Sequence, residues 1–294
     1  MGKRHERGNN VAEYRLGLYE KSMPDTLTIR EKLEHTRQAG FDYMELSIDE
    51  SDAKLARLDW TAEQLYNLRA DMWQTGTPIH SICLSGHRKY PLGHPDFKVR
   101  QRSMEIMEKA IVLASQLGIR LIQLAGYDVY YEEGCDETRD YFLENLKKAV
   151  LMAGKYGVML GFETMETPFM NTVAKAMAYV NAVGSPWLQI YPDLGNLTNA
   201  VGEEVPTDLE AGKGHLAALH LKETVPGVFR EVPFGTGHVD FVSGAGKALE
   251  LGVRAFVGEF WYVGAKNWEE ELAVANSFLR EKLHEGAQHS RTDS

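Results

Sequence analysis

Short apolar runs alternate with longer amphipathic segments along almost the whole chain. The apolar runs cover residues 14–19, 43–48, 78–84, 119–125, 159–163, 188–193, 216–220 and 256–259. Segments with the apolar spacing of helices follow them, at about residues 28–40, from 61, 96–117, 138–156, 172–183, 207–214, 241–251 and 267–283. Eight strand patterns alternating with eight helical patterns predict an α/β protein that forms a single (β/α)8 TIM barrel.

Local signals support this division and place the ends of the domain. Thr61 and Gln64 have the spacing of a capping box, and Gly118 and Gly157 stand where helices are expected to end. A doubly wound open sheet is the alternative, but the turn after the first strand, residues 20–24, lacks the glycines that such folds use there. We expect a flexible extension over residues 1–13, one catalytic domain over 14–285 and a disordered tail over 286–294.

Composition narrows the class of protein. The chain has 294 residues, 44% of them apolar, which is enough for one large core. A net charge of -10 argues against a nucleic-acid partner. Its two cysteines, Cys83 and Cys135, can form neither a disulfide framework nor a Cys-rich zinc site. Because no signal peptide and no long apolar run are visible, we expect no membrane association and a cytoplasmic location.

The last four predicted strands each end in a residue type that binds metals. These residues are Glu163, Asp193, His220 and Glu259, separated by 30, 27 and 39 residues. A strand with its returning helix needs about 30 residues or more, so the four side chains are expected at the carboxyl ends of successive parallel strands. Taken singly they have other readings: a salt-bridged glutamate, a helix N-cap and a core histidine. Together they predict one divalent cation, Mn²⁺, Mg²⁺ or Zn²⁺.

Three loops at the same predicted face carry groups that bind anions. They contain His87 and Arg88, Lys222, and the turn from Gly235 to Gly237. Each has an ordinary alternative, a solvated charge pair or a plain turn. The other histidines do not repeat the strand-end placement, which favours one metal over the trinuclear site of a DNA-repair endonuclease on this fold.

Six strings stand out when taken together, residues 15–21, 85–88, 161–166, 191–196, 220–224 and 235–237. They resemble the L-ribulose-5-phosphate 3-epimerase family of L-ascorbate and pentose breakdown, and the resemblance covers about residues 14–283. The resemblance implies a xylose-isomerase-like barrel with one divalent metal held by the same four residues. It further implies that Glu163 and Glu259 are the acid/base pair, and that the substrates are L-ribulose 5-phosphate and L-xylulose 5-phosphate.

Epimerisation at C3 needs a base on each face of the sugar and a means of stabilising the enediolate. Free-sugar ketose 3-epimerases carry a His three residues after the metal Asp and an Arg six after the metal His, where this chain has Asn196 and Pro226. Expected substrate contacts are Glu166, Asn196, Lys222, His87, Arg88, Gly235, Gly237 and Trp261. The alternatives are a sugar-phosphate isomerase, a free-ketose 3-epimerase and a non-catalytic sugar-binding regulator. We also expect a homodimer or higher homo-oligomer.

Overall fold

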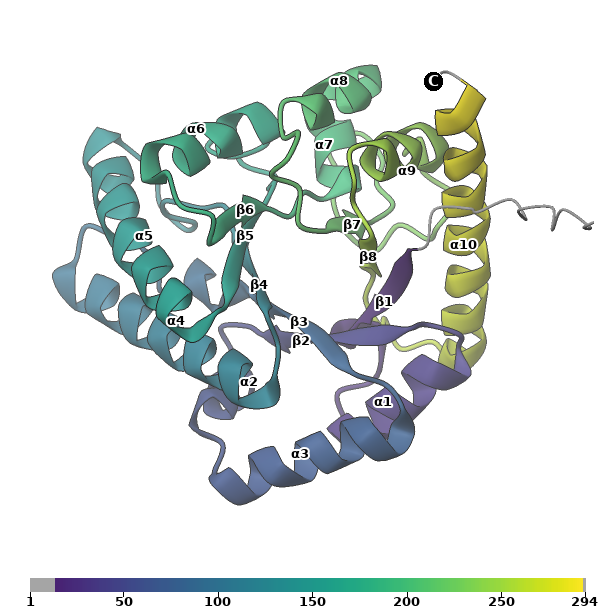
Figure 1. Ribbon diagram of the computed structural model, residues 1–294, viewed down its shortest axis with the longest axis horizontal. Coiled ribbons are helices and arrows are strands. Elements are labelled where there is room, and N and C mark those ends of the chain that lie inside the picture. The colour runs from purple at the N-terminus through teal and green to yellow at the C-terminus, as the bar shows by residue number, and fades with distance from the viewer. Residues whose placement is uncertain (1–13, 293–294) are drawn as a thin grey trace, which may run out of the picture.

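The computed structural model describes residues 14–292, and eight parallel strands form its centre (Figure 1). The strands are β1 (Arg15–Tyr19), β2 (Tyr43–Ile48), β3 (Ile79–Leu84), β4 (Leu121–Ala125), β5 (Met159–Glu163), β6 (Leu188–Ile190), β7 (Leu219–Leu221) and β8 (Ala255–Gly258). They pair in the order β6-β5-β4-β3-β2-β1-β8-β7. Parallel bridges from Ile190 to Leu216 and from Asp193 to His220 join the two ends of this order. The predicted (β/α)8 barrel is therefore confirmed.

Helices surround the strands on the outside (Figure 1). They are α1 (Ile29–Gln38), α2 (Asp52–Leu55), α3 (Ala62–Thr75), α4 (Phe97–Leu117), α5 (Asp136–Tyr156), α6 (Val173–Val183), α7 (Leu194–Val201), α8 (Val205–Glu210), α9 (Phe241–Glu250) and α10 (Trp268–Thr292). Short 3-10 turns, η1 (Glu20–Ser22), η2 (Ala56–Asp59), η3 (Ser85–Arg88) and η4 (Gly202–Glu204), follow some strands and helices. The extension expected over residues 1–13 lies outside the described residues.

The local signals in the sequence act as predicted. The backbone N–H of Gln64 donates to the Thr61 hydroxyl, and the Gln64 side-chain oxygen accepts from the Thr61 N–H, which closes the capping box at the start of α3. Gly118 and Gly157 end α4 and α5 with φ values of 78° and 64°. These values lie in the left-handed region, which glycine adopts without a steric penalty.

Parts of the chain differ from the prediction. Residues 194–201, which the apolar pattern did not assign to a helix, form α7 because Asp193 caps the helix and Leu194 and Leu197 are fully buried. The last helix, expected to stop near residue 283, continues to Thr292, so residues 286–292 are helical where a disordered tail was expected. The reason is a close crossing of α9 and α10, in which Gly286 lies directly against the backbone of Gly246. Residues 293–294 lie outside the described residues.

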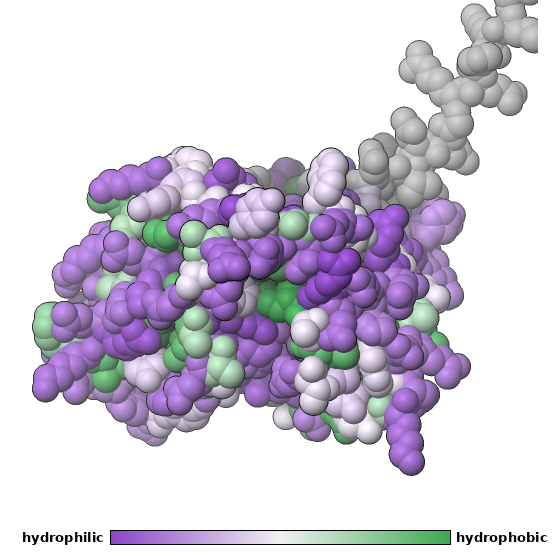
Figure 2. Space-filling model, turned by 90° about the horizontal axis from the view of Figure 1, so that it is seen from below, coloured by the Kyte–Doolittle hydropathy of each residue, from purple (hydrophilic) through white to green (hydrophobic). Residues whose placement is uncertain are grey.

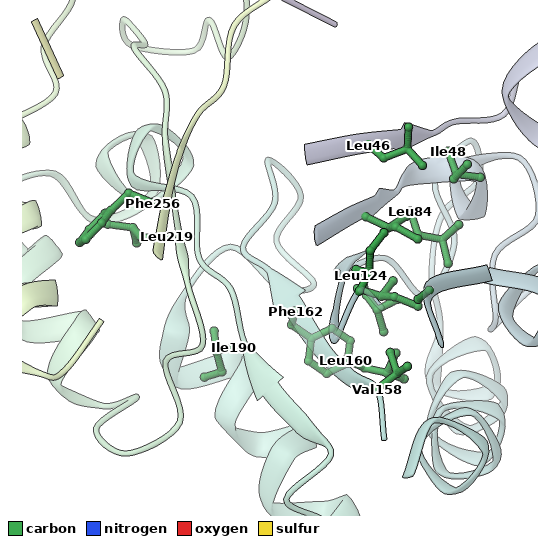
Figure 3. Packing of buried hydrophobic residues seen from close by; sticks show 14 of the residues in the cluster. Leu46, Ile48, Leu84, Leu124, Val158, Leu160, Phe162, Ile190, Leu219 and Phe256 are labelled. Atoms are coloured by element: carbon green, nitrogen blue, oxygen red, sulfur yellow. The ribbon is translucent and has the colours of Figure 1, made fainter. Parts of the chain in front are cut away.

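The apolar core has an outer and an inner part, because successive strand residues point to opposite faces. Outward-facing side chains of neighbouring strands pack beneath the helices, and Figure 3 shows this for Leu46, Ile48, Leu84 and Leu124 and for Leu219 beside Phe256. A smaller cluster fills the inside of the barrel and includes Tyr19, Tyr43, Tyr191 and Val257.

Gly17 shows how tightly this inner space is filled. A Cβ atom at this position would lie 2.1 Å from the Tyr43 ring, and the Tyr43 hydroxyl donates to the Phe256 carbonyl at 2.7 Å. The absence of a side chain at Gly17 thus leaves room for the Tyr43 ring, which fills part of the inside of the barrel.

The face of the molecule that Figure 2 shows is mainly polar. Hydrophilic residues predominate on this face, and hydrophobic residues form small, separate patches. Among the helices of residues 14–292, none combines the length and the apolarity needed to cross a bilayer.

Candidate metal centre

The structure brings the four strand-end residues together. Glu163 is the last residue of β5, Asp193 follows β6, His220 lies within β7 and Glu259 follows β8. One potential ligand atom from each lies within 4.8 Å of those of the other three, and all four side chains are buried. The convergence of these four side chains agrees with the prediction made from their spacing.

Asp193 has two roles, one for each carboxylate oxygen. Its Oδ1 accepts the backbone N–H of Asn196 at 2.6 Å and so caps α7. Its Oδ2 is buried without a hydrogen-bond partner among the described residues. A buried carboxylate oxygen without a partner is costly unless a cation or donor reaches it. The helix-cap and metal-ligand readings of Asp193 are thus compatible.

His220 faces two different partners with its two ring nitrogens. Nδ1 lies 3.4 Å from Glu163 Oε1 and 3.5 Å from Glu259 Oε2, on the side of the other candidate ligands. Nε2 lies 2.7 Å from Oε1 of Glu45, which comes from β2 on the other side of the barrel. Sequence reasoning did not identify Glu45, although a lone glutamate in a fully buried strand is a signal that something must pair with it.

Lys222 lies inside the cluster rather than at its rim. Its Nζ is 3.3 Å from Asp193 Oδ1 and 3.1 Å from Glu259 Oε2. Burial raises the pKa of Asp193, with Lys222 opposing this. Burial also disfavours ionisation of Glu259, but the Lys222 and His220 charges hold the pKa of that carboxyl well below its usual range.

The two candidate bases have different neighbours. The amide of Gln123 in β4 donates to Glu163 Oε2, whereas Glu259 lies beside the Lys222 ammonium. A neutral donor orients a carboxylate, and a cation in addition stabilises its charge. Glu163 and Glu259 are therefore not equivalent, although both flank His220.

Glu166 lies in a group of polar and aromatic side chains near the candidate metal ligands. It accepts hydrogen bonds from Tyr127 at 2.6 Å and Tyr130 at 3.3 Å, and Arg230 is 3.6 Å away. Burial opposes ionisation of Glu166, but these donors and nearby arginines lower its pKa overall. The two tyrosines follow β4 and were not singled out from the sequence, although an aromatic cluster directly after a barrel strand is a signal.

Arg88 and Trp261 contact side chains that lie near the candidate ligands. The Arg88 guanidinium lies 5.3 Å from the centre of the Tyr130 ring, and its buried Nε has no hydrogen-bond partner among the described residues. The Trp261 ring has Lys222 and Arg230 within 5.8 Å and 5.7 Å of its centre. Arg88 is thus connected to Glu166 through Tyr130, and Trp261 contacts Lys222 at the ligand cluster.

Other expected substrate contacts are held by the protein itself. The His87 ring nitrogen is 3.2 Å from the Ser103 carbonyl in α4, and burial lowers the pKa of His87 to about 4. Asn196 donates its amide to the Thr164 carbonyl at 2.7 Å, and its side-chain oxygen is buried without a partner.

The turn from Gly235 to Gly237 surrounds the carboxylate of Glu223. The Gly235 N–H donates to Glu223 Oε2 at 2.9 Å, and the Val239 N–H donates to Oε1 at 3.2 Å. A Cβ at Gly237 would lie 2.3 Å from Oε1. The turn thus already binds an anionic group, the side-chain carboxylate of Glu223.

The donor set fits one divalent cation. Three carboxylates and one imidazole converge, and with Glu45 behind the imidazole the centre carries more acidic than basic groups. Oxygen-rich sets of this kind suit Mg²⁺ and Mn²⁺, and a mixed oxygen and nitrogen set also suits Zn²⁺.

Comparisons with known proteins agree with this geometry. A model of the family described as xylose isomerase-like TIM barrel matches residues 33–282. The L-ribulose-5-phosphate 3-epimerase UlaE of Salmonella paratyphi C is 45% identical over 91% of this chain and 94% of that protein. Among solved structures, a D-psicose 3-epimerase superposes with a TM-score of 0.78 at 17% identity, covering 92% of this chain and 99% of the other. An L-ribulose 3-epimerase superposes with a TM-score of 0.73 at 19% identity, covering 95% and 96%.

Proposed function

Because this chain belongs to the L-ribulose-5-phosphate 3-epimerases within the xylose isomerase-like TIM barrels, we propose that it interconverts L-ribulose 5-phosphate and L-xylulose 5-phosphate. The observation that carries the proposal is the position of Glu163 and Glu259. They reach the same centre from β5 and β8, two strands that are not neighbours. An epimerase needs such a pair, one base for each face of the reacting carbon.

The two carboxylates exchange roles with the direction of reaction. One removes the proton from C3, which leaves an enediolate, and the other returns a proton to the opposite face. When bound at the centre, a divalent cation polarises the neighbouring carbonyl and so makes the C3 proton more acidic. Asp193 and His220 serve as ligands only, while Glu163 and Glu259 are both ligands and acid/base groups.

The remaining side chains are proposed to bind and orient the sugar. Glu166, with Tyr127 and Tyr130, presents polar groups to hydroxyls, and Trp261 helps to exclude water. Arg88, with its unpartnered Nε, is our candidate for an anionic group of the substrate. The enclosed positions of His87 and Gly235 make them weaker candidates, since their polar atoms are already bound.

The reaction and its metal dependence are tested together in D₂O. Metal-loaded protein incubated with L-ribulose 5-phosphate is expected to place deuterium at C3 and to form L-xylulose 5-phosphate, followed by proton NMR. Chelator treatment is expected to abolish both, and added Mn²⁺, Mg²⁺ or Zn²⁺ to restore them. Label at C1 with an aldose product would instead identify an isomerase. Faster turnover of unphosphorylated L-ribulose would identify a free-ketose epimerase.

We further propose that the protein is a homodimer or higher homo-oligomer. Two exposed apolar side chains, Val263 before α10 and Val274 within it, line a cleft together with Phe234 and Phe278 and provide surface for such contacts. Light scattering at micromolar concentration is expected to give at least twice the mass of one 33.1 kDa chain. A single-chain mass across that range would rule the proposal out.

A further inference from the structure

We propose that Glu45 is a positioning residue that holds His220 in the orientation needed for metal binding. The hydrogen bond joins Glu45 Oε1 to His220 Nε2 over 2.7 Å, and neither side chain has any exposed surface. β2 and β7 are not paired in the barrel, so this contact crosses its interior. The proposal rests on the metal centre of the proposed function.

Glu45 is itself held by two donors. Its Oε2 accepts the Ser81 hydroxyl at 2.6 Å and the Tyr191 hydroxyl at 2.9 Å, and both donors are fully buried. Because these two donors occupy one carboxylate oxygen, the other is directed at the imidazole. Tyr191 also packs edge-on against the His220 ring, with centres 4.7 Å apart.

This arrangement determines which ring nitrogen faces the ligand cluster. A carboxylate only accepts hydrogen bonds, so Nε2 must carry the proton that it donates to Glu45. Nδ1, on the side of Glu163 and Glu259, is then the nitrogen whose lone pair a cation bound at the centre would take, in place of any proton that it carries. Such an outer partner fixes both the tautomer and the plane of a ligating histidine, and its removal typically weakens metal binding 10- to 100-fold.

Metal affinity tests the proposal without requiring turnover. Co²⁺ binding to the apoprotein is measured by competition with a chromophoric chelator, and the visible spectrum of the bound Co²⁺ reports the ligand geometry. Glu45→Ala is expected to weaken binding by about 10- to 100-fold and to alter the spectrum. Glu45→Gln, whose amide oxygen still accepts from Nε2, is expected to recover most of the affinity.

Tyrosine variants supply a matched pair that keeps the glutamate. Tyr191→Phe removes a donor to Glu45, whereas Tyr43→Phe removes an equally buried hydroxyl that bonds to the Phe256 carbonyl. We expect Tyr191→Phe to weaken Co²⁺ binding severalfold and Tyr43→Phe to leave it unchanged. Equal affinities in wild type, Glu45→Ala and Tyr191→Phe would overturn the proposal, and if Glu45→Ala does not fold, the tyrosine pair decides. Co²⁺ binding without any epimerase activity would contradict the proposed function alone.

Discussion

Replacing either Glu163 or Glu259 by glutamine is expected to stop epimerisation while proton exchange continues in one of the two sugars. With one base removed, the remaining carboxylate still takes the C3 proton from its own face and returns deuterium to that same face. The substrate is then labelled without inversion. The loss of acid/base catalysis on the other face is expected to slow epimerisation by at least about a hundredfold.

The two variants are expected to be complementary. If Glu163→Gln labels only one of the two ketopentose phosphates in D₂O, Glu259→Gln is expected to label only the other. Proton NMR of each sugar incubated separately with each metal-loaded variant measures this. The geometry is compatible with it, because the two carboxylates come from strands that are not neighbours and both lie close to His220 Nδ1, at 3.4 and 3.5 Å.

Glu223→Gln provides the matched control. Glu223 is also a buried carboxylate after β7, but it binds the backbone of the turn at Gly235 and is not among the candidate ligands. This variant is expected to keep epimerisation, with label at C3 of both sugars. If Glu163→Gln and Glu259→Gln label the same sugar, or if either one still epimerises at the wild-type rate, the two-base assignment is wrong.

The convergence of the four candidate metal ligands was predictable because two simple regularities combine at these positions. Strand periodicity places the four residues at strand ends, and a parallel barrel brings those ends to one face. Asp193 shows a limit of this reasoning. The sequence offered a helix cap and a ligand as alternatives, whereas the structure uses one oxygen as the cap and leaves the other without a partner.

The supporting contacts could not be predicted, for a physical reason. Glu45 and His220 are separated by 175 residues and lie on strands that do not pair, so no local pattern connects them. At the turn around Gly235 the local sequence indicated binding of a substrate anion, whereas the structure shows a carboxylate of the protein bound there. The sequence of this turn is typical of an anion-binding turn, and only the fold reveals that Glu223 supplies the carboxylate. Side chains that act across a barrel require the three-dimensional arrangement.

Another buried carboxylate, Glu20, binds a cluster of cations and has no counterpart in the sequence prediction. It directly follows β1 and is fully buried. Its oxygens lie 3.1 Å from Lys32 Nζ, 2.6 Å from Lys54 Nζ and 2.6 Å from Arg57 Nη1. Among the described residues, the other carboxylate near the two lysines is Asp25, which is 80% exposed. Glu20 thus supplies most of the negative charge that balances these three cations. Through them it connects α1, α2 and η2 to the barrel.

Glu20→Gln is therefore expected to lower the free energy of unfolding by about 3 to 5 kcal/mol, the usual cost of removing one partner from a buried ion pair. Urea unfolding at neutral pH, in chelator so that metal binding does not contribute, measures this loss. Glu34→Gln is the control, because Glu34 pairs with Arg30 at the exposed surface and its loss is expected to change the free energy of unfolding very little. Equal effects of the two substitutions would show that the cluster does not stabilise the fold.

The pH dependence of the difference in unfolding free energy between wild type and Glu20→Gln tests whether this difference is electrostatic. Burial opposes ionisation of Glu20, but Arg57, Lys32 and Lys54 hold the pKa of its carboxyl well below the usual range. Its contribution is thus complete above the pKa of about 4.3 expected in the unfolded chain, and it is lost as the pH falls below that value toward the folded-state pKa. The stability gap between wild type and Glu20→Gln is expected to shrink progressively below about pH 4. A gap of constant size in acid would mean that packing of the side chain, rather than its charge, stabilises the cluster.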